Sequence, residues 1–170
     1  MKLRKGRATL RLVDLSGDPP GEILLFREGV NRSYKGELLF DGESAKAVLE
    51  DSKDHGAEYF FDYDHASLFM PAKDAGEAAA WFSLEVRKGE LWAINIRWTE
   101  EAAERVKARK YRYISPAVDY DEKTRRILRL INVALTNLPA SHGLPPIMAA
   151  SQKEFYAYRR ASSYRGGARA

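Results

Sequence analysis

The sequence of 170 residues contains no cysteine, which excludes disulfides, thiolate catalysis and zinc sites built from cysteine. It has no apolar run near the roughly 20 residues that span a membrane, so no membrane contact is expected. The basic N-terminus lacks the apolar stretch of a secretory signal, which favours cytosolic synthesis. Neither GxGxxG nor GxxxxGKS/T occurs, so a phosphate-binding loop is not supported.

Motifs for metal-dependent and α/β-hydrolase chemistry are also missing. HExxH and GxSxG do not occur, and His55, His65 and His142 are too far apart for a local zinc pair. Asp62, Asp64 and His65 leave a divalent-ion site open as an alternative, although acidic loops around one histidine are common without metal. We expect neither a metal nor another cofactor.

The composition is that of one globular domain, with 45% hydrophobic and 31% charged residues. The net charge of +4 is uneven, because basic residues gather near the C-terminus. We therefore expect one domain over residues 1–150 and a basic tail over 151–170, which could be a linker remnant. The tail is read either as a solvated terminus or as a contact for nucleic acid or an acidic partner.

Alternating apolar and polar residues predict a β-rich protein. Strands are expected at 8–15, 22–28, 37–42, 57–65, 111–120 and 125–137, with a hairpin over 81–99 and a loop at 29–37. Helices are expected at 43–56, with Ser44 as N-cap and Gly56 as its end, at 99–110, with Thr99 as N-cap, and at 151–162. Short connections indicate an α+β fold with a mostly antiparallel sheet that closes into a barrel flanked by helices.

One serine, one histidine and one asparagine are candidates for nucleophilic catalysis. A serine hydroxyl needs a nearby base, and the base needs a polar group that fixes its tautomer. His65 follows an apolar strand, Ser115 lies in a second strand, and Asn132 is a polar residue in the apolar row of a third. A short turn joins the last two strands, so Ser115 and Asn132 are expected to be neighbours. Each residue also has an ordinary structural interpretation, namely an edge hydroxyl, a surface imidazole and a hydrogen-bonded core amide.

The ordered segments FDYDH, AAAWF, LWAINIRWTEEA, YRYISPAV and VALTNLPA resemble the protein I proteases of Mu-like phages. The resemblance covers residues 8–148 and rests on five segments in order. The group looks related to the prohead proteases and, more distantly, to the herpesvirus assemblins. The resemblance therefore implies a β-barrel with flanking helices that carries a serine nucleophile and a histidine base.

Site residues follow from this resemblance. Ser115 takes the place of the nucleophile, His65 that of the base and Asn132 that of the third catalytic residue. Asp62 is the rival third member, because it is close to His65 in sequence and acidic. The loop Ala140-Ser141 lies where backbone amides build the oxyanion hole. A peptide groove is expected to be lined in part by aromatic residues, or these pack in the core: Trp81, Trp92, Trp98, Tyr111 and Tyr113.

The function implied by the resemblance is a serine endopeptidase of capsid maturation. It would cleave scaffold and major capsid proteins through an acyl-enzyme, inside the immature capsid in the host cytoplasm. Assemblins are activated by dimerisation, so a homo-oligomer is open. Two alternatives remain: a non-catalytic capsid or scaffold module that keeps the protease fold, and a nucleic-acid-binding protein that uses the basic tail and the segment Arg109–Tyr113.

Overall fold

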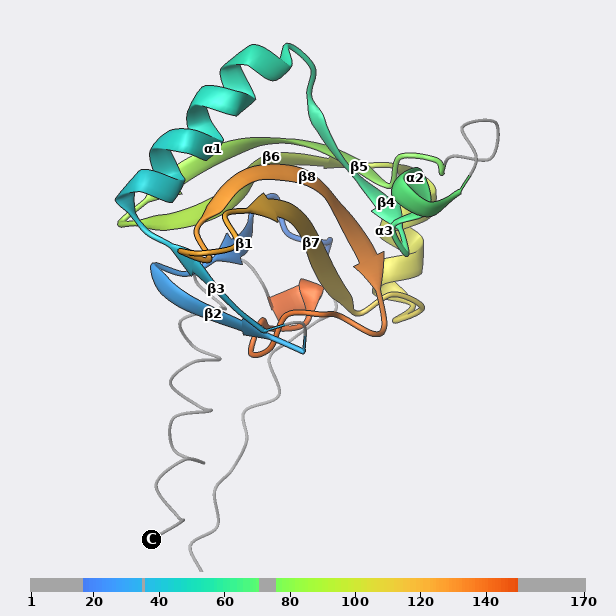
Figure 1. Ribbon diagram of the computed structural model, residues 1–170. Helices are drawn as coiled ribbons and strands as arrows, with labels where there is room; N and C mark the ends of the chain where they lie inside the picture. Colours follow the sequence, from blue (N-terminus) through green and yellow to red (C-terminus); the bar gives the residue numbers. More distant parts are fainter. Residues whose placement is uncertain (1–16, 35, 71–75, 150–170) are drawn as a thin grey trace, which may run out of the picture.

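A six-stranded sheet in the order β1-β6-β5-β4-β8-β7 forms the body of the protein (Figure 1). The computed structural model describes residues 17–34, 36–70 and 76–149. The strands of this sheet are β1 (Ile23–Phe26), β4 (Tyr59–Tyr63), β5 (Ala80–Arg87), β6 (Glu90–Trp98), β7 (Tyr113–Tyr120) and β8 (Ile127–Thr136). Four of the five strand pairs are antiparallel, and β4 with β8 is parallel.

A separate hairpin, β2 (Gly29–Ser33) with β3 (Gly36–Phe40), lies between the two ends of this sheet. It directly follows β1 in the chain, which is one edge of the sheet. Isolated bridges join Leu39 to Arg126, next to β8, and Ser33 to Ser141. The hairpin thus links the β1 edge to the β7–β8 end, and the protein is β-rich with a nearly closed mixed sheet.

Three α-helices are found in the described residues: α1 (Gly42–His55), α2 (Ala66–Phe69) and α3 (Glu100–Lys107), with a short 3-10 helix η2 (Ile147–Ala149). In Figure 1, α1 crosses the sheet, while α2 and α3 lie at one end of it. Thr99 caps α3 by accepting a hydrogen bond from Ala102 N. Gly56 ends α1 in the left-handed conformation, with φ of 67°, which costs glycine little.

Apolar side chains from the inner face of the sheet, from the hairpin and from two helices form one continuous core. Phe61 of β4 packs against Phe82 and Trp98, with ring centroids 4.7 and 5.6 Å apart. Val48 of α1 and Val106 of α3 are buried against the same core. Successive side chains of a strand point to opposite faces of the sheet. One face of β4 and β8 therefore packs in the core, and the other face carries polar residues.

The structure confirms most of the predicted elements in the described residues, including the hairpin over 81–99 and both helices. Residues 29–37, which were expected to form a loop, instead form β2 and the turn into β3, because this stretch pairs with a strand that follows it. The N-cap of α1 is Asp41 and not Ser44, whose side chain is buried and donates to Leu39 O. The strand predicted at 8–15 and the helix and tail predicted after residue 150 lie outside the described residues.

Candidate active site

Asp62, Ala134 and Ser115 lie in one row across three neighbouring strands. Asp62 of β4 is opposite Ala134 of β8, and Ala134 is opposite Ser115 of β7. Partners in a sheet share a face, so these three side chains stand on the face opposite to Phe61 and Val133. Asn132 stands on the same face, two residues before Ala134. Asp62, Ser115 and Asn132 are all buried, with 0%, 4% and 3% of their surface exposed.

A tight turn after β4 brings His65 back over this row. Asp64 and His65 are both left-handed, with φ of 51° and 58°. A non-glycine residue in this conformation costs free energy and persists only where the surrounding structure fixes it. Such conformations concentrate at functional sites. Here Asp64 N donates to Leu135 O of β8 at 2.9 Å. The His65 ring is consequently directed to β8, where its Nδ1 lies 2.9 Å from Asn132 Oδ1.

Asp62 and Asn132 are linked through a buried hydrogen-bond network. Asn132 Nδ2 donates to Asp62 Oδ2 at 2.8 Å and to Ser67 Oγ at 2.7 Å. Ser67 in turn donates to Asp62 Oδ2 from its backbone N at 2.9 Å and from its hydroxyl. Asn132 is therefore the residue that contacts Nδ1 of the His65 ring, and Asp62 contacts Asn132.

Ser115 and His65 line one open groove with a volume of about 630 Å³. Within the described residues the Ser115 hydroxyl makes no hydrogen bond, so Ser115 and His65 share the groove without a direct bond. Pro116 also lines the groove, and β7 is an edge strand of the sheet. A proline gives no amide to a ladder, so pairing along this edge is interrupted at Pro116 alone.

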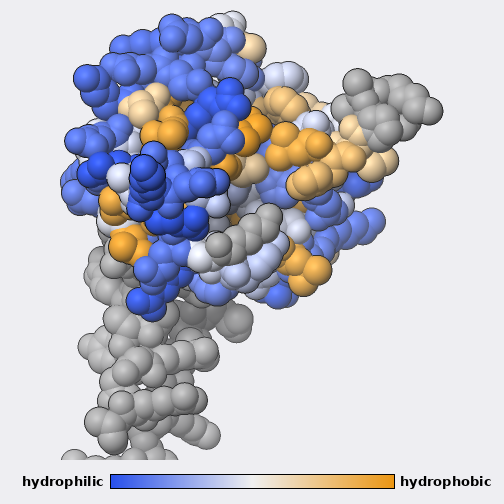
Figure 2. Space-filling model, in the orientation of Figure 1, coloured by the Kyte–Doolittle hydropathy of each residue, from blue (hydrophilic) through white to orange (hydrophobic). Residues whose placement is uncertain are grey.

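Exposed apolar side chains surround the groove. Phe69 and Leu138, with 76% and 88% of their surface exposed, lie on its rim together with Tyr34, Leu68 and Tyr120. Figure 2 shows hydrophobic surface on the right of the view, beside α2. Apolar rims of this kind mark sites that bind another molecule rather than solvent.

Ala140 and Ser141, in the segment after β8, also line the groove. Tyr34 N donates to Ala140 O at 3.2 Å, and His142 N donates to Arg32 O at 2.8 Å. Among the described residues, neither the Ala140 nor the Ser141 backbone N–H donates a hydrogen bond. The segment is therefore fixed by its neighbours, while its own amides remain available for a ligand.

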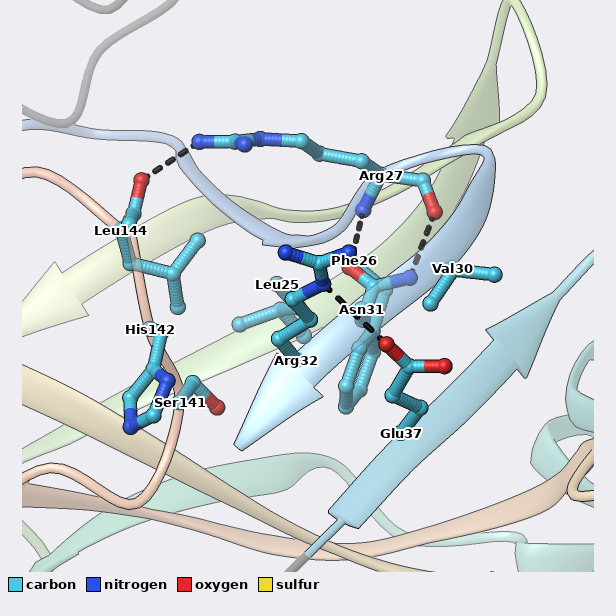
Figure 3. Close-up of a pocket in the computed structure, with 11 residues that line it drawn as sticks. Leu25, Phe26, Arg27, Val30, Asn31, Arg32, Glu37, Ser141, His142 and Leu144 are labelled. Atoms are coloured by element: carbon cyan, nitrogen blue, oxygen red, sulfur yellow. Dashed lines mark hydrogen bonds and ion pairs between the residues drawn. The ribbon is translucent and has the colours of Figure 1, made fainter. Parts of the chain in front are cut away.

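A second pocket of about 470 Å³ lies behind this segment, with Ser141 and His142 on one side and Arg32 and Glu37 on the other (Figure 3). The Arg27 guanidinium donates to Gly143 O, and Asn31 holds the backbone of Arg27 through hydrogen bonds of 2.9 Å in both directions. These contacts fasten the segment that carries Ser141.

Two charged side chains that line the groove, Asp64 and Arg125, contact aromatic neighbours. Tyr111 donates to Asp64 Oδ2 at 3.3 Å, and the pKa of Tyr111 is raised, first by burial and then by the Asp64 charge. Arg125 lies over the Tyr120 ring, 4.2 Å from its centroid.

In the part of the chain that the structure describes, no group of three acidic or histidine residues could hold a metal ion, and no helix is long and apolar enough to span a membrane.

The structure changes several expectations about the site. Ser115 and Asn132 are on paired strands, as expected, and are diagonal neighbours, because Ser115 faces Ala134 and Asn132 faces Ala117. The aromatic residues expected to line a groove do not line it, since Trp92 is fully buried and the others pack elsewhere; the groove instead has Phe26, Tyr34, Phe69 and Tyr120.

Sequence reasoning missed Ser67 and Gly76. Ser67 lies five residues after Asp62 in a one-turn helix that apolar periodicity cannot reveal. Gly76 lies against this turn so closely that a Cβ there would be 2.9 Å from the Cβ of Ala66. The pattern Asp-x-x-His-x-Ser over 62–67 was a local signal for the first of them.

The fold and the site define a β-rich domain with a serine, a histidine and an asparagine–aspartate pair on one face of a nearly closed sheet. A family model described as the N-terminal domain of Mu-like prophage I protein matches residues 23–148, and the chain belongs to this family.

Two relatives carry related names. The chain is 32% identical to Protease I of Escherichia phage Mu over 120 residues, which are 65% of this chain and 32% of the relative. It is 28% identical to the Mu-like prophage FluMu I protein of Haemophilus influenzae over 162 residues, which are 85% of this chain and 44% of the relative. The chain thus spans less than half the length of either relative. No solved structure matches it.

Proposed function

We propose that this protein is a serine endopeptidase that cleaves scaffold and other head proteins during phage capsid maturation. The observation that carries the proposal is that Ser115 and His65 line one groove while Asn132 holds the Nδ1 atom of His65. The name of the relative from phage Mu, Protease I, supports a protease. The assemblin-like barrel and a place inside the immature capsid in the host cytoplasm belong to the same proposal.

The groove is suited to an extended polypeptide. One wall is the edge strand β7, and the rim is apolar. An extended segment can add to a sheet edge through its main chain and place alternate side chains in adjacent pockets. Phe69 and Leu138 would then contact apolar side chains of the substrate. The enzyme should therefore prefer cleavage sites that have apolar residues.

The chemistry would be acyl transfer. His65 Nε2 takes the proton of the Ser115 hydroxyl as its Oγ attacks the scissile carbonyl carbon. The backbone N–H groups of Ala140 and Ser141 donate to the oxygen of the tetrahedral intermediate. The protonated His65 then gives the proton to the leaving amine, which leaves an ester on Ser115. Water, deprotonated by His65, hydrolyses this ester and regenerates the hydroxyl.

Ser115→Ala tests the proposal directly. Wild-type protein should react with a fluorophosphonate probe at Ser115 and should cleave a scaffold protein of the same phage. The Ser115→Ala variant should do neither, because a methyl group is no nucleophile; a fall in kcat of about 1,000-fold or more is expected. Labelling is read by peptide mass spectrometry.

Ser83→Ala is the matched control, because Ser83 is an exposed serine on β5 outside the groove. It should label and cleave as the wild type does. Equal cleavage by wild type and Ser115→Ala would show that Ser115 is not the nucleophile.

A non-catalytic head-assembly module is the second candidate function. It is favoured by the missing hydrogen bond between Ser115 and His65 in the described residues. Apo enzymes commonly have long catalytic contacts that tighten with substrate, which is why the protease is preferred. A wild type that neither labels nor cleaves, yet binds scaffold, would favour the module.

A further inference from the structure

Asp62 is a completely buried acid for which the core has no evident use. It is 0% exposed, and its Oδ1 has no hydrogen-bond partner in the described residues. None of the ion pairs found there includes Asp62. Burying a carboxylate without a neighbouring cation costs free energy. A functional role for Asp62 would explain why the fold accepts this cost. All three donors that reach it, Ser67 N, Ser67 Oγ and Asn132 Nδ2, converge on Oδ2.

The contact with Asp62 fixes which way the Asn132 amide faces. A carboxylate oxygen accepts hydrogen bonds and an amide NH₂ donates them, so the Nδ2 end must face Asp62, 2.8 Å away. The Oδ1 end then faces His65 Nδ1 at 2.9 Å. Because an amide oxygen only accepts, the hydrogen of the neutral imidazole must be on Nδ1. The lone pair is left on Nε2, the nitrogen that a base needs.

We propose that Asp62 is a positioning residue that acts through Asn132 to hold the neutral His65 ring as its Nδ1–H tautomer. The asparagine supplies the geometry of a third triad member, and the aspartate supplies the orientation of that asparagine. Without Asp62, the amide can turn over and present its NH₂ to Nδ1. The hydrogen then moves to Nε2, and Ser115 loses its base. The catalytic part of this inference rests on the proposed function, whereas the tautomer does not.

The tautomer is measured by long-range ¹H–¹⁵N NMR correlation on uniformly labelled protein, at a pH where the His65 ring is neutral. His55→Gln and His142→Gln, both at exposed positions, assign the three ring systems. In the wild type the hydrogen should be on Nδ1. A wild-type ring with its hydrogen on Nε2 would overturn the proposal, and this measurement needs no variant to fold.

Asp62→Asn then tests the role of the aspartate. This substitution keeps the shape of the side chain but replaces a group that only accepts hydrogen bonds. The Asn132 amide is then free to turn over, and the His65 NMR signals should move toward those of the Nε2–H tautomer. Asp119→Asn is the matched control, since Asp119 is an exposed acid on β7 paired with Arg129, and its His65 signals should equal those of the wild type. Unchanged His65 signals in folded Asp62→Asn would overturn the proposal.

The kinetic consequence separates positioning from substrate binding. Asp62 and Asn132 do not line the groove, so KM should stay within about twofold while kcat falls about 100-fold or more, the usual effect of losing a general base. A parallel rise in KM with unchanged kcat would count against the proposal. If the tautomer shifts but the wild type cleaves nothing, the positioning role stands and the proposed protease function fails.

Discussion

At the scale of single residues, small side chains make room for the His65 turn. Gly76 packs against the start of α2, where an added Cβ would lie 2.9 Å from Ala66 Cβ and 4.0 Å from Asp62 Cβ. Ala134 stands between Asp62 and Ser115 in the row across the sheet and is fully buried. A larger residue at position 76 would collide with Ala66, which directly follows His65.

Gly76→Ala should therefore displace the turn. We expect the free energy of unfolding to fall by about 1–3 kcal/mol, as for other overpacked sites, and peptidase activity to fall with it. Urea unfolding and a kcat measurement check this. Gly42→Ala is the control, because nothing lies within 4 Å of its added Cβ; alanine at this helix position should leave stability unchanged or raise it by up to about 1 kcal/mol. A wild-type kcat in Gly76→Ala would show that the turn has more freedom than its packing indicates.

At the scale of elements, α1 is tied to the strand that carries Asn132. Asp41 caps the helix by accepting from Glu43 N and Ser44 N at 3.1 and 3.0 Å. Its other oxygen accepts from Arg126, next to β8, at 2.8 Å. The Ser44 N–H and then the Arg126 guanidinium lower the pKa of Asp41 below its usual value of 3.8. The cap and the ion pair thus fix α1 against β8 together.

Asp41→Ala should cost about 1 kcal/mol of unfolding free energy at neutral pH, the usual value of an N-cap. A lowered folded-state pKa gives stability that is present above the unfolded-state value and is lost as the pH falls through the folded-state value. The difference between wild type and Asp41→Ala should thus be constant from about pH 5 to 8 and shrink below about pH 4.

Asp41→Asn is the matched control for this prediction. It keeps a good capping side chain but loses the charge that faces Arg126, so it should lose less stability than Asp41→Ala. Urea unfolding at several pH values measures all three proteins. A difference between wild type and Asp41→Ala that does not change down to pH 3 would contradict the assignment.

At the scale of the whole molecule, closure of the sheet builds the groove. The hairpin β2–β3 meets the segment after β8 through the Ser33–Ser141 bridge, and Ser141 lines the same groove as Ser115. Gly143 follows in a left-handed conformation, with φ of 75°, and its carbonyl accepts from Arg27. The wall with the proposed oxyanion donors therefore depends on contacts between the two ends of the sheet.

Gly143→Ala should weaken this wall, because a left-handed backbone costs a residue with Cβ about 1–2 kcal/mol. We expect kcat to fall several-fold through displaced amides, with fluorophosphonate labelling slowed in proportion. Gly21→Ala has no neighbour within 4 Å of its added Cβ and no positive φ, so it serves as control. Normal kinetics in Gly143→Ala would remove the 140–143 segment from the proposed mechanism.

Local patterns in the sequence predicted much of the fold. The alternation over 81–99 predicted the β5–β6 hairpin, and the Thr99 cap predicted the start of α3. The β2 strand was missed because its alternation is weak and its stability comes from pairing with β3. The parallel pairing of β4 with β8 has no local signal at all, since the partners are separated by α2, β5, β6, α3 and β7.

The sequence by itself determined which residues are candidates for the chemistry: Ser115, His65 and Asn132, with Asp62 as the acidic rival. Only the tertiary structure decided how they are connected. Asp62 and Asn132 are 70 residues apart, and the register of β4 on β8 makes them neighbours rather than rivals. The physical reason is that side-chain type is local, whereas the contact of an amide with a carboxylate on one side and an imidazole on the other depends on strand register and a strained turn.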